Sequence, residues 1–167
     1  MTSRRESTAL VAASPEVLFD WLDDPTRLGA HMSGSSVMMG GGAMSYELDN
    51  DQGRALGSRI KMNGQAFGID LFVEEVITQR EPPSRKAWRT VGKPRLVVLG
   101  GYEMGFNIRP TGGGSRLRVW IGYELPERGL GRRIPVLGAL YARWCVRQMV
   151  NDAVRHFGAV AAPKARR

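Results

Sequence analysis

The chain has 167 residues and a formal net charge of +8 at neutral pH, a length that suits one domain. Its apolar fraction of 43% is ordinary for a globular protein and argues against disorder. A single cysteine, Cys145, excludes an internal disulfide and a multi-cysteine zinc site. No apolar run approaches the roughly 20 residues that span a bilayer, and residues 1–10 lack the apolar core of a signal peptide. We therefore expect a cytoplasmic protein.

The N-terminal part predicts a strand followed by two short helices. Residues 5–12 form the strand, and Ser14 and Pro15 mark a helix start, because a hydroxyl N-cap precedes a proline at the first helical position. The segment 23–25 ends this helix, and residues 26–32 form the second one. One face of the first helix is apolar and consists of Val17, Leu18, Trp21 and Leu22.

The middle of the chain predicts six strands separated by turn-rich segments. Residues 81–84 end one strand, because proline cannot donate to a β-ladder. Residues 111–115 are glycine-rich and predict a hairpin connection. Large apolar side chains at every second position make the last strand the clearest. The predicted strands are residues 43–48, 58–66, 69–79, 86–91, 96–109 and 117–125.

The C-terminal part predicts a long amphipathic helix. Residues 126–133 form a basic loop, Pro135 begins the helix, and Gly158 can end it after Phe157. We expect one domain over residues 1–158 and a flexible basic tail over 159–167. The apolar stripe of the helix consists of Ala142, Val146, Met149, Ala153 and Phe157.

The order of these elements predicts an α+β architecture. Neither a long amphipathic helix nor a curved sheet can bury its apolar face alone. We expect a helix-grip fold, in which a curved antiparallel sheet of about seven strands wraps around the C-terminal helix, with two short helices after the first strand. Such a sheet and helix often enclose a cavity.

The segment 10–25, Leu-Val-Ala-Ala-Ser-Pro-Glu-Val-Leu-Phe-Asp-Trp-Leu-Asp-Asp-Pro, resembles the start of START-like proteins. This SRPBCC superfamily includes the birch-pollen allergen fold and the polyketide cyclase/dehydrase group. Segments 76–83 and 112–119 look like its proline-containing turn and its last hairpin, so the resemblance covers about residues 5–158. It implies a hydrophobic pocket for lipids, polyketides, hormones or similar ligands. Fold alone does not decide activity.

Aromatic residues and methionines are the main candidates for the cavity wall. Flexible methionines suit an adaptable pocket, and tyrosine hydroxyls can orient a polar ligand atom. Plain core packing explains any one of them equally well, because wall and core are continuous in such a fold. The candidates are Met44, Tyr46, Met62, Leu71, Val73, Trp88, Tyr102, Met104, Phe106, Val119, Ile121, Tyr123, Met149, Ala153 and Phe157.

Three residues are candidates for acid–base chemistry: Glu75, His31 and Tyr123. Alternation places Glu75 on the same side of its strand as Leu71 and Val73. A carboxyl that faces an apolar cavity has a raised pKa and can act as an acid or base in a cyclisation or dehydration. The opposite side of the strand also carries apolar residues, so the alternation leaves the orientation open. A solvent-facing or ion-paired glutamate is the more ordinary expectation.

The other chemistry-bearing residues predict no metal, nucleotide or cofactor site. His31 and His156 are too far apart for a local metal-ligand pattern. Cys145 lies beside the apolar stripe, which predicts a buried, inert thiol. The glycines at 40–42 are not followed by Lys-Ser or Lys-Thr, so they do not form a phosphate loop.

Positive charge is concentrated at the C-terminal end. From Glu127 onward, nine basic residues stand against two acidic ones. Leucine and isoleucine lie among Arg128, Arg132 and Arg133, a mixture that suits an anionic lipid surface. A solvated helix face with a basic tail is the simpler interpretation. Nucleic acid is not expected as a partner, because no recognised binding motif accompanies the charge.

Three functions are compatible with these patterns. The leading hypothesis is binding or transport of a hydrophobic small molecule, lipid-like or polyketide-like, in an internal cavity. The first alternative is a cyclase or dehydratase that acts on a polyketide-like substrate. The second is a peripheral lipid-binding protein that docks on membranes through its basic C-terminal segment. The absence of a complete catalytic set favours binding over catalysis, and the oligomeric state is left open.

Overall fold

A single antiparallel sheet and a long helix dominate the structure, a computed structural model that describes residues 2–30 and 44–161. The helices and strands, in chain order, are β1 (Ser3–Val11), α1 (Pro15–Leu22), α2 (Pro25–Leu28), β2 (Met44–Leu48), β3 (Arg59–Ala66), β4 (Ile69–Glu81), β5 (Arg85–Arg95), β6 (Tyr102–Thr111), β7 (Gly114–Tyr123), α4 (Leu130–Arg133) and α5 (Pro135–Phe157). Within these ranges no helix is long and apolar enough to cross a bilayer.

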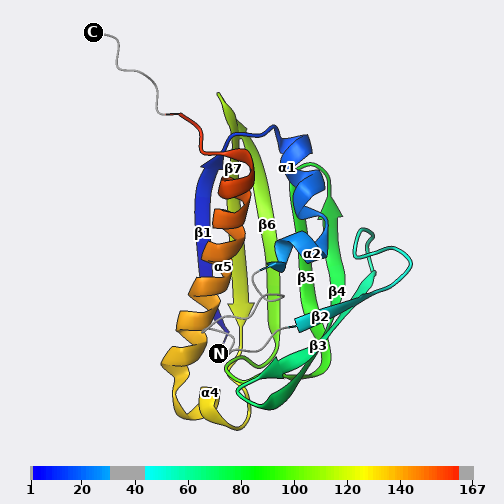
Figure 1. Cartoon of the computed structure of the whole chain (residues 1–167), viewed down its shortest axis with the longest axis vertical. Coiled ribbons are helices and arrows are strands. Elements are labelled where there is room, and N and C mark those ends of the chain that lie inside the picture. The colour runs from blue at the N-terminus through cyan, green and yellow to red at the C-terminus, as the bar shows by residue number, and fades with distance from the viewer. Residues whose placement is uncertain (1, 31–43, 162–167) are drawn as a thin grey trace.

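The sheet has seven strands in the order β1-β7-β6-β5-β4-β3-β2, and every neighbouring pair is antiparallel. Helix α5 runs along one face and packs mainly against β1 and β7. Helix α1 lies near the C-terminal end of α5, whereas α4 lies at its N-terminal end (Figure 1). This arrangement confirms the predicted α+β helix-grip fold.

The helix boundaries follow from local signals in the sequence. The Ser14 hydroxyl accepts a hydrogen bond from the backbone N–H of Val17 at 3.4 Å, and Pro15 occupies the first position of α1. Helix α5 also starts with a proline, and it is capped after Phe157 by Gly158, whose φ of 87° is easily adopted only by glycine. These signals explain why both helices begin where the sequence predicts.

The chain remains attached to the sheet immediately after α5. The backbone N–H of Ala12 donates to the Gly158 carbonyl at 2.9 Å, and Ala159 forms a β-bridge with Val11. The expected tail, residues 159–167, therefore starts with a sheet contact. Residues 162–167 lie outside the described part of the chain.

Two predictions about local structure are wrong. Residues 96–101, predicted as the start of a strand, form an irregular connection between β5 and β6. Gly131 explains why the connection lies where it does: a Cβ on this residue would be 2.7 Å from the Cα of Val98, so only glycine permits the approach. Residues 130–133, predicted as loop, form the single turn of α4.

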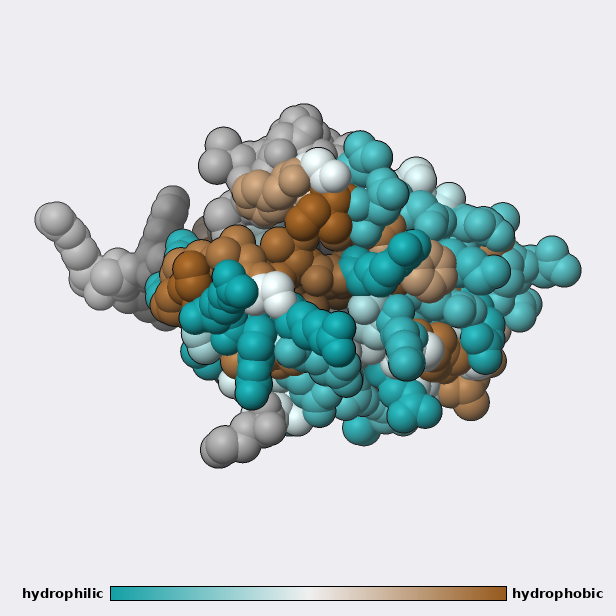
Figure 2. Space-filling view, turned by 90° about the horizontal axis from the view of Figure 1, so that it is seen from below, coloured by the Kyte–Doolittle hydropathy of each residue, from teal (hydrophilic) through white to brown (hydrophobic). Residues whose placement is uncertain are grey.

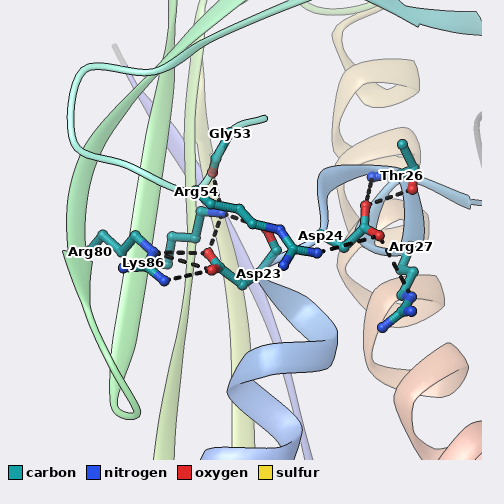
Figure 3. A network of polar contacts seen from close by, with 8 residues as sticks. All are labelled: Asp23, Asp24, Thr26, Arg27, Gly53, Arg54, Arg80 and Lys86. Carbon is teal, nitrogen blue, oxygen red and sulfur yellow. Dashed lines mark hydrogen bonds and ion pairs between the residues drawn. The ribbon is translucent and has the colours of Figure 1, made fainter. Parts of the chain in front are cut away.

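A buried ion pair fastens α1 to the sheet (Figure 3). The Lys86 ammonium donates to the Asp23 carboxylate at 2.7 Å, to the Asp23 carbonyl at 2.9 Å and to the Gly53 carbonyl at 2.6 Å. Arg80 donates a further hydrogen bond to the Asp23 carboxylate at 2.7 Å. Burial alone would raise the pKa of Asp23, but the hydrogen bonds from Arg80 and Lys86 outweigh it and hold that pKa below its ordinary value. This network joins α1, β4, β5 and the connection between β2 and β3.

Replacing Asp23 with asparagine is expected to lower the free energy of unfolding by about 3–5 kcal/mol, because it leaves the Lys86 charge buried without a carboxylate. The lowered pKa of Asp23 means that its contribution is present above its ordinary pKa of 3.8 and is lost as the pH falls below it. Urea unfolding of both proteins at neutral and acidic pH measures the difference.

Asp24→Asn is the matched control for this substitution. The Asp24 carboxylate caps α2 and forms looser ion pairs with Arg27 at 3.7 Å and Arg54 at 3.8 Å. Asparagine also caps helices well, so the expected cost is about 1 kcal/mol or less. Equal losses in the two variants would contradict the role of the buried Asp23–Lys86 ion pair in fastening α1 to the sheet.

Candidate functional site

A cavity of about 250 Å³ lies between the sheet and the N-terminal half of α5. Its volume is just below the roughly 300–1,000 Å³ that is typical of small-molecule sites. The wall is formed by the inward faces of β2 to β7, by α2, α4 and α5, and by the connection between β5 and β6. Elements that lie far apart in the sequence thus enclose one apolar space.

Strand register aligns the wall residues in rows across the sheet. Tyr46 pairs with Met62, which pairs with Val73 on the next strand. Trp88 pairs with Met104, which pairs with Ile121. Paired residues in neighbouring strands point to the same side of a sheet, so each row presents its side chains to the cavity together.

Ten of the fifteen residues predicted for the cavity wall line this space: Met44, Tyr46, Met62, Leu71, Val73, Trp88, Tyr102, Met104, Ile121 and Met149. The other five, Phe106, Val119, Tyr123, Ala153 and Phe157, do not line it. Most of these lie where α1 covers the sheet and fills the interior. There Phe106 packs edge-on against Phe19 with ring centroids 5.6 Å apart, and Phe157 packs against Trp21 at 5.7 Å.

Besides single residues of α2, α4 and the strands, two parts of the wall were not predicted. The first is the connection between β5 and β6, whose apolar residues at 96–99 face the cavity instead of continuing a strand. The second is a helix stripe at four-residue steps, Leu137, Tyr141 and Cys145, which leads to Met149. The helical spacing of this stripe was visible in the sequence, but nothing there indicated that it faces a space and not solvent.

Glu75 brings a carboxyl into the apolar wall. Its side chain is 5% exposed and accepts a hydrogen bond from the Tyr102 hydroxyl. Burial raises the pKa of Glu75 to about 7, although hydrogen bonds from Tyr102 and Trp88 and the charge of Lys86 act in the opposite direction. The expectation of a solvent-facing or ion-paired Glu75 is therefore wrong, because the side of β4 that carries it faces the cavity.

The other polar groups of the wall are neutral at physiological pH or already paired. The Tyr46 hydroxyl donates to the Gly29 carbonyl at 3.0 Å, and burial raises the pKa values of Tyr46 and Tyr141. Burial raises the pKa of the Cys145 thiol to about 12, which makes it a poor nucleophile. Lys86 reaches the wall, but its ammonium binds Asp23 and Gly53. Among the described wall residues, the Glu75 carboxyl alone has a pKa near neutrality.

The remaining predicted residues fall into three groups. Tyr123 is buried outside the cavity wall, and His31 lies outside the described residues. Arg128, Arg132 and Arg133 are exposed beside α4. Within residues 2–30 and 44–161, no group of three histidine, cysteine, aspartate or glutamate side chains is placed to hold a metal ion.

Known structures with the same architecture come from several kinds of protein. The Zhui aromatase/cyclase from Streptomyces superposes with a TM-score of 0.70 at 10% identity, covering 93% of both chains. Norcoclaurine synthase from Thalictrum flavum, solved with dopamine and hydroxybenzaldehyde, gives a TM-score of 0.65 at 14% identity and covers 93% of this chain and 86% of its own. A protein from Thermus thermophilus gives 0.65 at 18% identity, covering 93% of this chain and 95% of its own.

At such low identities the structural likeness shows the fold alone. A search of curated proteins gave no match. A sequence profile described as "Polyketide cyclase / dehydrase and lipid transport", however, matches residues 3–162. Because this match spans nearly the whole chain, the protein belongs to the polyketide cyclase/dehydrase and lipid transport family of the START-like superfamily.

Proposed function

We propose that the protein binds a hydrophobic small molecule, lipid-like or polyketide-like, in the cavity between the sheet and α5. The observation that carries this proposal is an apolar cavity with one buried Glu75–Tyr102 pair in its wall. The ligand would therefore be mainly apolar and would carry one polar group that meets this pair.

The apolar wall supports affinity for a range of ligand shapes. Burial of apolar surface stabilises a complex by about 25 cal/mol per Å². Four methionines line the cavity: Met44, Met62, Met104 and Met149. Methionine side chains are unbranched and rotate easily, so the wall can adapt to the outline of a ligand.

The Glu75–Tyr102 pair supports recognition of a polar atom. A protonated carboxyl donates a hydrogen bond and also accepts one, whereas a carboxylate only accepts. With a pKa of about 7, Glu75 is present in both forms near neutral pH. Either form suits a hydroxyl group on the ligand, and the protonated form also suits a carbonyl oxygen.

The same pKa supports a second candidate function, acid–base catalysis of a cyclisation or dehydration. A general acid–base works best when its pKa lies near the working pH. In a dehydration, Glu75 would take a proton from the carbon next to a carbonyl group and return it to the departing hydroxyl, which leaves as water. Tyr102 would orient the carboxyl during both transfers.

Native mass spectrometry of protein loaded from a lipid-rich extract distinguishes binding from dehydration, the reaction that changes the mass of the ligand. Binding predicts one apolar molecule for each chain, recovered with an unchanged mass after incubation. Dehydration predicts a recovered mass lower by one water, and Glu75→Gln should abolish that change. A protein that takes up nothing from the extract would contradict both functions.

Filling the cavity is expected to weaken ligand binding at least about tenfold, since a bulky side chain would remove space that the ligand needs. Leu71→Trp introduces such a side chain in the wall, and titration with a fluorescent fatty acid measures the affinity. Leu56→Trp is the control, because Leu56 is 70% exposed and outside the cavity. Circular dichroism establishes that both variants fold. Equal affinity in a folded Leu71→Trp variant would contradict binding in this cavity.

Glu75→Gln is expected to raise the free energy of unfolding above neutral pH by on the order of 3 kcal/mol, because the folded wild type then holds a buried carboxylate. The pKa of Glu75 is raised from 4.5 to about 7. The contribution of Glu75 to the stability of the wild type is therefore fully present below pH 4.5 and is lost as the pH rises to about 7. Urea unfolding across this range should show no gain in acid and a constant gain above neutrality.

Glu74→Gln serves as the control on the opposite face of β4. The Glu74 carboxylate is partly exposed and pairs with Arg59 at 2.8 Å. We expect a small loss of stability in this variant, because exposed ion pairs contribute little. If the gain in Glu75→Gln had the same size at every pH, the raised pKa of Glu75 would be wrong.

A further inference from the structure

The exposed apolar side chains of the described residues are concentrated at one end of the molecule. Nine large hydrophobic residues are exposed in the described part of the chain. Six of them lie on two segments at this end. These segments are the hairpin between β3 and β4 and the stretch from α4 into α5. The six residues, which we call the apolar rim, are Phe67, Ile69, Leu130, Ile134, Val136 and Leu140.

The apolar rim is continuous with the cavity wall. Phe67, Leu130 and Leu140 are 59%, 45% and 52% exposed, and all three also line the cavity. A residue that meets both solvent and the cavity marks its opening. Figure 2, which views this end of the molecule, shows hydrophobic residues in a band that is bordered by hydrophilic ones.

Positive charge accompanies the rim. Arg128, Arg132 and Arg133 are exposed on and beside α4, and Lys93 and Arg95 are exposed at the end of β5. The exposed acidic residues near this end include Asp70, Glu103, Glu124 and Glu127. Basic residues thus outnumber acidic ones around an apolar opening. None of Arg128, Arg132 and Arg133 forms an ion pair with another described residue.

We propose that the apolar rim docks on an anionic lipid bilayer, with the arginines of α4 contacting the headgroups and the cavity opening toward the acyl chains. A bilayer surface offers negative charge at its headgroups and an apolar layer a few ångströms deeper. The rim and its arginines match both features. A nucleic acid offers only the negative charge, and it would leave six apolar side chains without a partner.

Docking gives an apolar ligand a path between the bilayer and the cavity that avoids water. This consequence rests on the proposed function, but the docking itself does not. Vesicle binding is measured on the protein without added ligand, so a failure of docking and a failure of cavity binding are distinguishable.

Co-sedimentation with vesicles tests the docking. The protein is expected to bind vesicles of phosphatidylcholine mixed with phosphatidylserine and to bind phosphatidylcholine alone much more weakly. Added salt should weaken the interaction, because it screens exposed charges. The double variant R132E/R133E should bind the mixed vesicles at least about 30-fold more weakly, since each basic residue near an anionic surface contributes about fivefold in affinity.

Two matched controls separate the docking surface from general charge and hydrophobicity. R109E/R116E changes the net charge equally at the hairpin between β6 and β7, at the opposite end of the sheet (Figure 1). A second test variant, the double substitution Ile69→Ser and Val136→Ser, removes apolar side chains on both sides of the opening without altering the cavity wall. Its control is the following double substitution at the other end of the molecule. Leu10→Ser with Val17→Ser removes exposed apolar side chains near the other end.

The proposal would be supported if R132E/R133E and the Ile69→Ser, Val136→Ser double variant bind vesicles more weakly while their controls change little. Equal losses in rim variants and controls would overturn it, and so would a wild-type protein that fails to bind mixed vesicles. Binding to duplex DNA without binding to vesicles would also overturn it, because charge alone would then explain the surface.

Discussion

The buried ion pair between Lys86 and Asp23 is the interaction on which the interior of this protein depends. It fixes the end of α1 to the middle of the sheet, and through Gly53 it also fixes the connection between β2 and β3. A buried ammonium is stable only when its donors are satisfied, and all three donors of Lys86 have acceptors. The charge of Lys86 only partly offsets the effect of burial on Glu75, whose pKa is raised to about 7.

The ion pair between Lys86 and Asp23 also explains why only one end of the interior is hollow. Helix α1 is held over β6 and β7, and its buried face fills the space there with Leu18, Phe19 and Leu22. At the other end, among the described residues, no helix fills the space against the sheet as α1 does. The wall there is closed by α4, by the start of α5 and by the connection between β5 and β6. That closure needs glycine at 131 and 138, because a Cβ at either position would come within 3.0 Å of the Val98 backbone.

Membership of the family narrows the function without deciding it. The structural neighbours include an aromatase/cyclase and a norcoclaurine synthase, so one architecture serves different chemistries. The cavity of this chain combines an apolar wall, one carboxyl whose pKa is raised to about 7, and a thiol that burial keeps protonated. The proposed docking of the apolar rim on a bilayer would add a route by which a ligand of low solubility reaches the cavity.

Short-range signals in the sequence determined most of the fold. Proline and capping residues set the starts of α1 and α5, and alternation identified β7. Alternation assigns residues to two faces of a strand, but it does not say which face is buried. Only the tertiary structure decided that Glu75 faces the cavity, that residues 96–99 form its wall, and that Phe106 belongs to the filled end. Each of these outcomes depends on a segment far away in the chain, whose packing no local pattern encodes.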